Sequence, residues 1–256
     1  MKKVNLILLD GMRPDALLQC GNPYVQELLA TSAYSLCART VFPSITLPCH
    51  MSLFHSVEPG RHGITNNIYT PQVRPVNGIM EQLHGKRSTA MVYNWDELRD
   101  LYRPGKSEFS LYISQYEYGL EQSHHEVFAA TEKLLREKAP DFCFTYSGWT
   151  DEQAHKSGWM SKEYLHALDV GVSSIRHLIE QTKDSYITIL VADHGGHDRT
   201  HGTMIDEDML IPVVIHGEGV CPGEITEPVS ILDIAPTIIK LLECEPAEEW
   251  EGRALL

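Results

Sequence analysis

The sequence predicts an α/β fold built on a mostly parallel sheet. Short apolar runs rich in valine, isoleucine and aromatic residues alternate with segments whose apolar residues recur every three or four positions. This pattern is typical of strands that alternate with helices. Carboxylates and imidazoles directly follow several of the runs, and ligand sites in open α/β sheets lie beyond the carboxyl ends of the strands. The two observations together predict one site at one edge of the sheet.

Five runs are expected to be buried strands, and four segments between them are expected to be helices. The strands are Val4–Leu9, Ser88–Tyr93, Asp141–Tyr146, Tyr186–Ala192 and Pro212–Ile215. The helices are Pro23–Ser32, Gly78–His84, Ser123–Lys138 and Lys162–Lys183. Residues 57–78 carry several prolines and glycines and are expected to form a long loop near the site. A helix is expected to start between Asp233 and Pro236.

Length and composition indicate one catalytic domain over residues 1–256, without a separate large cap domain. The formal charge is −14, which argues against a nucleic-acid polymer or an anionic membrane as partner. A small phosphorylated substrate is compatible, because bound metal ions concentrate positive charge locally. The apolar stretch Val4–Leu9 is too short for a signal peptide, and the six cysteines are scattered, so a cytoplasmic location is expected. Oligomeric state leaves no signal in the sequence.

The segment "WTDEQAHKSGW" places Asp151 and His155 four residues apart. In a helical turn both side chains project from one face, a geometry that suits one metal ion. An isolated pair of this kind is more typical of a solvated helix face. The ligand-type residues elsewhere in the chain favour the metal.

The segment "VADHGGHDRTHG" follows a predicted strand and carries Asp193, His194 and His201. Imidazoles combined with carboxylates suit zinc and its first-row neighbours, whereas calcium and magnesium prefer oxygen ligands alone. The two glycines after His194 are expected to permit a tight turn close to bound groups. The His197 side chain is expected either to contact one of the metal-ligating residues or to be exposed to solvent.

The segment "VFPSITLPCH" places Thr46 two residues before Pro48, at an expected helix start. A coordinated metal would lower the pKa of this hydroxyl enough to make it a nucleophile. Taken alone, the threonine is interpreted as a helix N-cap. Ser44 competes for either role, and spacing does not separate the two.

The seven candidate residues follow one another in the order Asp10, Thr46, Asp151, His155, Asp193, His194 and His201. With "LILLDGMRPD", "FPSITLPCHMSLFHSVEPGRHGITNN", "DEQAHKSG", "VADHGG" and "THGTMIDEDMLIPVVIHG", the chain resembles the alkaline phosphatase superfamily, most closely its nucleotide pyrophosphatase/phosphodiesterase branch. The resemblance covers most of the chain. It implies a three-layer α/β/α sandwich and two divalent metal ions, zinc in the first place and manganese as the alternative.

The resemblance also implies a role for each residue. One ion is held by Asp10, Thr46, Asp193 and His194, and the other by Asp151, His155 and His201. Thr46 is the implied nucleophile, which forms a phosphothreonine that water then hydrolyses. Asn67 is implied to hydrogen-bond a nonbridging phosphoryl oxygen, with Asn66 as the alternative.

The expected function is hydrolysis of phosphate esters, with a phosphodiesterase or nucleotide pyrophosphatase favoured. The alternatives are a phosphomonoesterase, a phosphonoacetate hydrolase-like enzyme, and a metal-binding sensor domain without turnover. A monoesterase needs additional positive charge near the phosphoryl group, and Arg13, Arg39 and Lys156 stand close to site elements in the sequence. A sulfatase is disfavoured, because "TLPCH" does not match C/S-x-P-x-R.

Overall fold

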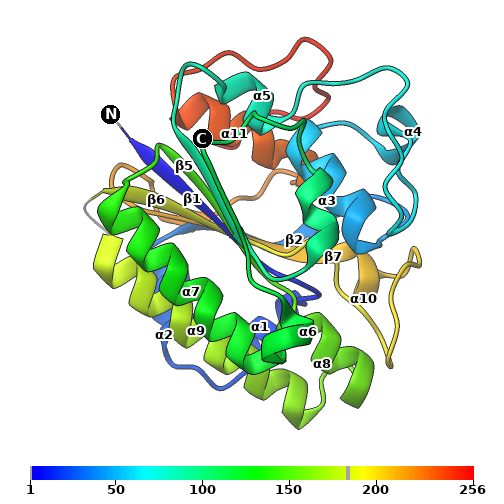
Figure 1. Cartoon of the computed structure of the whole chain (residues 1–256). Helices are drawn as coiled ribbons and strands as arrows, with labels where there is room; N and C mark the ends of the chain where they lie inside the picture. Colours follow the sequence, from blue (N-terminus) through cyan, green and yellow to red (C-terminus); the bar gives the residue numbers. More distant parts are fainter. Residues whose placement is uncertain (1, 183–184) are drawn as a thin grey trace.

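The computed structural model describes residues 2–182 and 185–256 and contains one eight-stranded sheet (Figure 1). Across the sheet the strands are ordered β4-β3-β5-β1-β6-β7-β2-β8. Strand β7 is antiparallel to both of its neighbours, and every other neighbouring pair is parallel. The predicted mostly parallel sheet is therefore confirmed. The strands are β1 (Lys3–Leu9), β2 (Ala33–Arg39), β3 (Thr89–Tyr93), β4 (Phe109–Tyr112), β5 (Phe142–Ser147), β6 (Tyr186–Val191), β7 (Leu210–His216) and β8 (Gly223–Glu224).

Helices cover both faces of the sheet, which confirms the three-layer arrangement (Figure 1). One face carries α1 (Pro14–Gln19), α2 (Tyr24–Ala30), α6 (Gln115–Tyr118), α7 (Leu120–Glu137), α8 (Trp149–Ser157) and α9 (Lys162–Thr182). The other face carries α3 (Thr46–His55), α4 (Pro59–His62), α5 (Ile79–Leu83) and α11 (Ile234–Leu241). The remaining short elements are α10 (Asp206–Met209), η1 (Asp96–Asp100) and η2 (Ile231–Asp233). Among the described residues, no helix has both the length and the apolar character needed to cross a bilayer.

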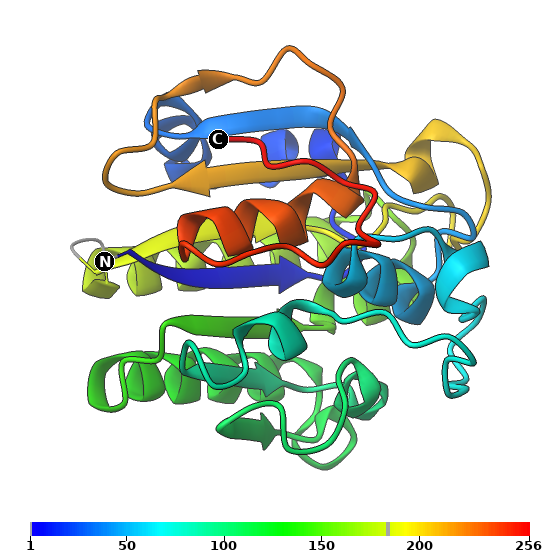
Figure 2. The same cartoon turned by 90° about the horizontal axis from the view of Figure 1, so that it is seen from above.

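The three central strands end at the same level of the sheet. Leu9 of β1 pairs with Ser147 of β5, and Leu8 pairs with Val191 of β6. All residues of β5 and β6 are buried, as expected for parallel strands covered by helices on both faces. Figure 2 shows β1 pointing toward the end of the sheet at which α3 begins. Residues that directly follow β1, β5 and β6 are thereby brought together at one edge.

The predicted elements are found within three residues at each end, apart from Lys183, which lies outside the described residues. The expected loop contains the short α4 and then neither helix nor strand over residues 63–78. Three strands were missed, and they are β2, β4 and the two-residue β8. Strand β4 is only four residues long, lies exposed at the sheet edge, and has its apolar residues interrupted by Ser110. Strand β2 is interrupted by a register shift between Ser35 and Ala38.

Candidate metal centre

The structure brings the seven predicted ligand residues together at the carboxyl edge of the sheet. Asp10 directly follows β1, and Asp193 and His194 follow β6. The first turn of α8, which follows β5, supplies Asp151, and its last turn supplies His155. Two further residues complete the cluster, although neither directly follows a strand of the central sheet. They are Thr46, the first residue of α3, and His201, in the loop before α10.

The side chains of Asp10, Asp193 and His194 form the inner half of the centre, next to Thr46. His194 Nε2 lies 3.2 Å from the Thr46 hydroxyl, 3.3 Å from Asp10 Oδ1 and 3.4 Å from Asp193 Oδ2. The three ligand side chains are at most 3% exposed. The nucleophile candidate therefore lies against two carboxylates and an imidazole in a nearly water-free environment.

The side chains of Asp151, His155 and His201 form the outer half. His155 Nε2 lies 3.3 Å from Asp151 Oδ2, and His201 Nε2 lies 3.8 Å from Asp151 Oδ1. The His201 ring stacks on that of His194 at 3.8 Å between centroids, so the two halves adjoin. Ligand atoms of Asp151, His155 and His201 lie within 4.8 Å of one another, and so do those of Asp10, Asp151 and His194.

Backbone carbonyls orient all three imidazoles in the same way. The Nδ1 atoms of His194, His155 and His201 lie 2.8–2.9 Å from the carbonyl oxygens of Gly195, Arg199 and Ser44. Because a carbonyl only accepts, each Nδ1 donates, and in the neutral ring Nε2 then carries a lone pair. These lone pairs face carboxylate oxygens, an arrangement that is favourable when a cation lies between them.

The buried carboxylates also fit a cation. Within the described part of the chain, Asp10 Oδ1, Asp151 Oδ1 and Asp193 Oδ2 have no hydrogen-bond partner. Burial, followed by the charge of Asp151, raises the pKa of Asp193 to about 8, whereas burial lowers the pKa of His194 to about 3. Burial and the Asp193 carboxylate also raise the pKa of Asp10. A cation would offset this unfavourable accumulation of negative charge, and the neutral imidazole is the form that ligates metal.

The hydroxyls of Ser44 and Thr46 are separated by the structure. Ser44 is buried and donates to the Thr203 carbonyl at 2.7 Å, so its hydroxyl is engaged in holding the loop. Thr46 instead points to His194 at the amino-terminal end of the ten-residue α3. Asn67 Oδ1 accepts from the Leu47 N–H at 3.0 Å, which leaves the Asn67 amide donor for the site. Asn66 caps the exposed Ile68 N–H.

The two glycines after His194 have a different role from the one expected. Neither has a positive φ, so no turn of glycine-only geometry is present. A Cβ at Gly195 would lie 2.1 Å from the Glu207 carbonyl oxygen, and one at Gly196 would lie 2.2 Å from the Trp159 ring. Close packing of the ligand loop against Trp159 and Glu207 therefore requires these glycines.

His197 lies outside the ligand sets and pairs with Asp208, which the sequence analysis missed. His197 Nδ1 lies 2.7 Å from Asp208 Oδ1, and Asp208 Oδ2 accepts from the backbone and hydroxyl of Thr203 at 2.8 Å. Asp208 is fully buried. It therefore braces both ends of the loop that carries His201. No spacing rule identified it, because its partners lie on both sides of a loop with no regular period.

A cavity of about 110 Å³ opens onto the centre. Besides ligand residues it is lined by Asn67, Trp95, Gln115, Tyr146 and Glu152. None of its lining residues, in the part of the chain that the structure describes, is lysine or arginine. The carboxylates that line the cavity therefore have no lysine or arginine beside them to balance their charge.

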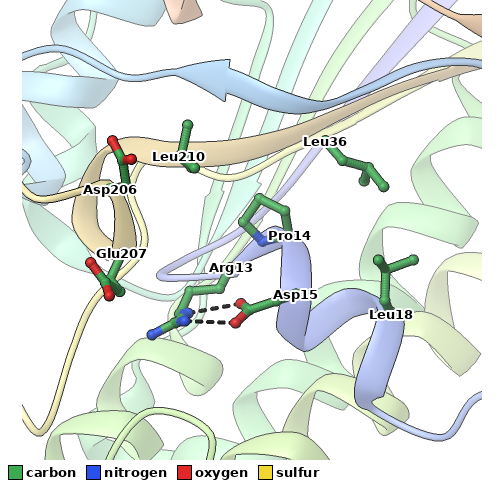
Figure 3. A pocket seen from close by; sticks show the side chains of 8 residues that line it. All are labelled: Arg13, Pro14, Asp15, Leu18, Leu36, Asp206, Glu207 and Leu210. Carbon is green, nitrogen blue, oxygen red and sulfur yellow. Dashed lines mark hydrogen bonds and ion pairs between the residues drawn. The ribbon is translucent and has the colours of Figure 1, made fainter.

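Arg13 points into a different pocket, of about 390 Å³ (Figure 3). Its guanidinium forms two hydrogen bonds with the Asp15 carboxylate, at 2.6 and 2.8 Å, and donates to the Gly196 carbonyl at 3.0 Å. Arg39 pairs with Asp206 on the surface, and Lys156 is exposed. The three cations considered from the sequence therefore lie outside the lining of the metal cavity.

Two family models match the chain at the segments that build this centre. Residues 4–89, with Asp10, Thr46 and Asn67, match type I phosphodiesterase/nucleotide pyrophosphatase. Residues 109–246, more than half of the chain and with the other five candidate ligands, match the metalloenzyme superfamily. The chain belongs to the metalloenzyme superfamily. The predicted resemblance to the alkaline phosphatase superfamily is confirmed, and the family match supports metal ions at this cluster.

Solved structures of superfamily members share the fold. An inactive variant of murine ectonucleotide pyrophosphatase/phosphodiesterase 5 in complex with AMP has a TM-score of 0.78 and 13% identity, covering 96% of each chain. Phosphonate monoester hydrolase of Agrobacterium radiobacter has a TM-score of 0.77 and 15% identity, covering 100% of this chain and 76% of that one. A similar sequence is that of phosphopentomutase from Photorhabdus laumondii. It is 29% identical over 121 residues, which span 47% of this chain and 29% of that relative's length.

Proposed function

We propose that the chain is a phosphodiesterase with Thr46 as nucleophile and two divalent metal ions, zinc in the first place and manganese as the alternative. The observation that carries the proposal is the position of the Thr46 hydroxyl, 3.2 Å from the Nε2 of His194 and beside unpartnered buried carboxylate oxygens. A hydroxyl in such a cluster is placed to share a metal ion with it. A structural N-cap would instead accept a hydrogen bond from a backbone N–H of the first helical turn. The hydroxyl of Ser44 is engaged elsewhere, because it donates to the Thr203 carbonyl.

The inner half with Thr46 would hold one ion and the outer half the other. When bound, the two ions supply charge that lowers the pKa of the threonine hydroxyl and offsets the negative charge of the phosphoryl group. The amino-terminal end of α3 adds a partial positive charge at the same place. Asn67, held through its carbonyl by the Leu47 N–H, directs its amide N–H at the developing equatorial charge.

In the proposed reaction, the deprotonated Thr46 oxygen attacks phosphorus in line and the alcohol on the opposite side departs with the bonding electron pair. The departing oxygen takes up a proton from solvent, which reaches the outer half at the exposed side chain of His155. Water then attacks the phosphothreonine, returns the hydroxyl to Thr46 and releases the phosphomonoester.

A diester fits the cavity better than a monoester. A monoester carries one more negative charge, and no cationic side chain of the described residues lines the cavity to meet it. Arg13 is held by Asp15 and Gly196. With a net charge of −14, we propose a small phosphodiester as substrate instead of a nucleic-acid polymer.

The test compares bis-p-nitrophenyl phosphate with p-nitrophenyl phosphate on purified protein reconstituted with zinc or manganese. We expect a kcat/KM for the diester at least about tenfold above that for the monoester. A higher kcat/KM for the monoester would overturn the diester preference. Absence of turnover on both, with metal content verified by elemental analysis, would overturn the hydrolase.

A further inference from the structure

We infer that the metal cavity contains a subsite, formed by Gln115, Glu152 and Trp95, for a small ammonium-bearing alcohol group of the substrate. The inference rests on the proposed function, because it assigns one ester substituent of the phosphodiester. The three residues come from α6, α8 and the segment before η1, and all line the metal cavity.

Gln115 offers a buried acceptor. Its side chain is 3% exposed, and its Oε1 has no hydrogen-bond partner among the described residues. The amide nitrogen of Gln115 lies 3.5 Å from Glu152 Oε1. This contact assigns the carbonyl oxygen to the other branch of the amide group, the one that does not contact Glu152. A Cβ on Gly148 would lie only 3.2 Å from this oxygen. The absence of a side chain at Gly148 therefore leaves space beside this buried oxygen, and an unpaired buried carbonyl is stabilised by any ligand that donates to it.

Glu152 adds a carboxylate that the metal sets do not use. It follows Asp151 on α8, yet it belongs to neither group of mutually close ligand atoms. It is half-buried, and no lysine or arginine of the described residues lines the cavity beside it. Its charge is therefore available to a cationic group of the substrate.

The rim near these residues is acidic and aromatic. Trp95 is half-buried, and its ring lines the cavity. Trp95 is directly followed by Asp96 and Glu97. Burial raises the pKa of the nearby Tyr116, and the negative charges of Glu97, Glu152 and Asp96 raise it further. An aromatic ring combined with surplus carboxylates is a setting that favours cations.

These groups together select one chemistry. A primary ammonium donates to Gln115 Oε1 and Glu152, and its charge is attracted to the Trp95 ring. A neutral alkyl group of the same size leaves the carbonyl unpaired, and a carboxylate or second phosphate is repelled by Glu152. The volume of about 110 Å³ limits the substituent to a few heavy atoms. Since Glu152 directly follows Asp151 of the outer half on α8, we assign the subsite to the alcohol that departs.

The test measures binding, so that it does not depend on turnover. Zinc-loaded Thr46→Ala is titrated calorimetrically at pH 7 with methyl 2-aminoethyl phosphate and with methyl propyl phosphate, two diesters that differ in the ammonium group. We expect the aminoethyl diester to bind about tenfold more tightly or better. Adding Glu152→Gln should reduce the ratio to below about threefold, and adding Gln115→Leu should reduce it in the same direction.

Glu163→Gln is the matched control. Glu163 is exposed on α9 and does not line the cavity, so this substitution removes the same charge as Glu152→Gln at a place outside the cavity. It should leave the ratio unchanged. Equal binding of the two diesters, a ratio insensitive to Glu152→Gln, or binding of inorganic phosphate without binding of either diester would overturn the subsite. Hydrolysis of bis-p-nitrophenyl phosphate by the parent chain reports the proposed function separately, so failure of one inference is distinguishable from failure of the other.

Discussion

The inner half of the centre is at most 3% exposed, whereas His155 of the outer half is 37% exposed and its partners Asp151 and His201 are each 10% exposed. Both halves combine carboxylates with imidazoles oriented by backbone carbonyls. The difference is access to water. In the proposed reaction, a buried inner half would strengthen every electrostatic interaction with the Thr46 oxygen, and an open outer half would let an alcohol leave and water enter. The predictions below test this division.

The largest effect is expected for Thr46→Ala at the inner half. Loss of the nucleophile should lower kcat by about 10⁴-fold or more, because no other group takes over the covalent step. Metal content should stay nearly unchanged, since Asp10, Asp193 and His194 remain. Ser44→Ala is the control and should keep kcat within about tenfold. The opposite ranking of the two variants in kcat would assign the reaction to Ser44.

Asn67→Ala should lower kcat by about 10²- to 10³-fold, the usual loss for one donor to a developing oxyanion. The Leu47 N–H also loses its acceptor. Asn66→Ala removes only an exposed turn contact with Ile68 and should keep kcat near that of the parent. Equal losses in the two variants, measured by steady-state kinetics, would show that Asn67 has no separate role.

Asp193→Asn and His155→Gln compare the halves directly. Asp193→Asn should deplete metal and activity together, because a buried ligand has no replacement. His155→Gln should weaken one ion by about 10- to 100-fold, because water can reach the vacated position. Chelator competition followed by elemental analysis measures both. Full metal occupancy in Asp193→Asn would remove it from the ligand set.

In the metal-free chain, the free energy of unfolding should fall as the pH rises. Burial raises the pKa of Asp193 from 3.8 to about 8, so the metal-free folded chain binds a proton more tightly than the unfolded chain. The contribution of Asp193 protonation to the free energy of unfolding is fully present below about pH 4 and is lost as the pH rises to about 8. The Asp151 hydrogen bond raises the pKa of His155 from 6.5 to about 9, and that contribution is lost over this higher range. The melting-temperature difference between metal-loaded and chelated protein should widen from pH 5 to 8, and a constant difference would contradict this account.

The smallest effect on catalysis is expected for Asp208→Ala, which removes the buried brace of the His201 loop. We expect a loss of about 2–3 kcal/mol in the free energy of unfolding, because His197 and Thr203 lose their acceptor. Metal binding should weaken at the outer half only. Asp206→Ala removes an exposed partner of Arg39 and should cost less than about 1 kcal/mol. Denaturant titration distinguishes the two, and equal losses would show that Asp208 is no brace.

Most of the ligand set was predictable because it depends on local order. The four-residue spacing of Asp151 and His155 determines that they share a helix face, and the apolar runs before Asp10 and Asp193 determine that both lie at strand ends. Strand β4 was missed because it is only four residues long and Ser110 interrupts its apolar residues. Asp208 was missed because its partners come from a loop without periodicity.

By itself, the sequence predicted that Asp10, Asp193 and the Asp151–His155 pair lie at one edge of the sheet, because helical and strand periods fix the direction of side chains along each element. Thr46 and His201 were added by the resemblance to a known family. Tertiary structure alone decided how deeply each half is buried, that Gly195 and Gly196 serve close packing, and that Arg13 faces Asp15. It also brought Gln115 and Trp95 beside Glu152. Burial and pairing across elements depend on how distant segments pack, and that information is absent from the spacing of residues along the chain.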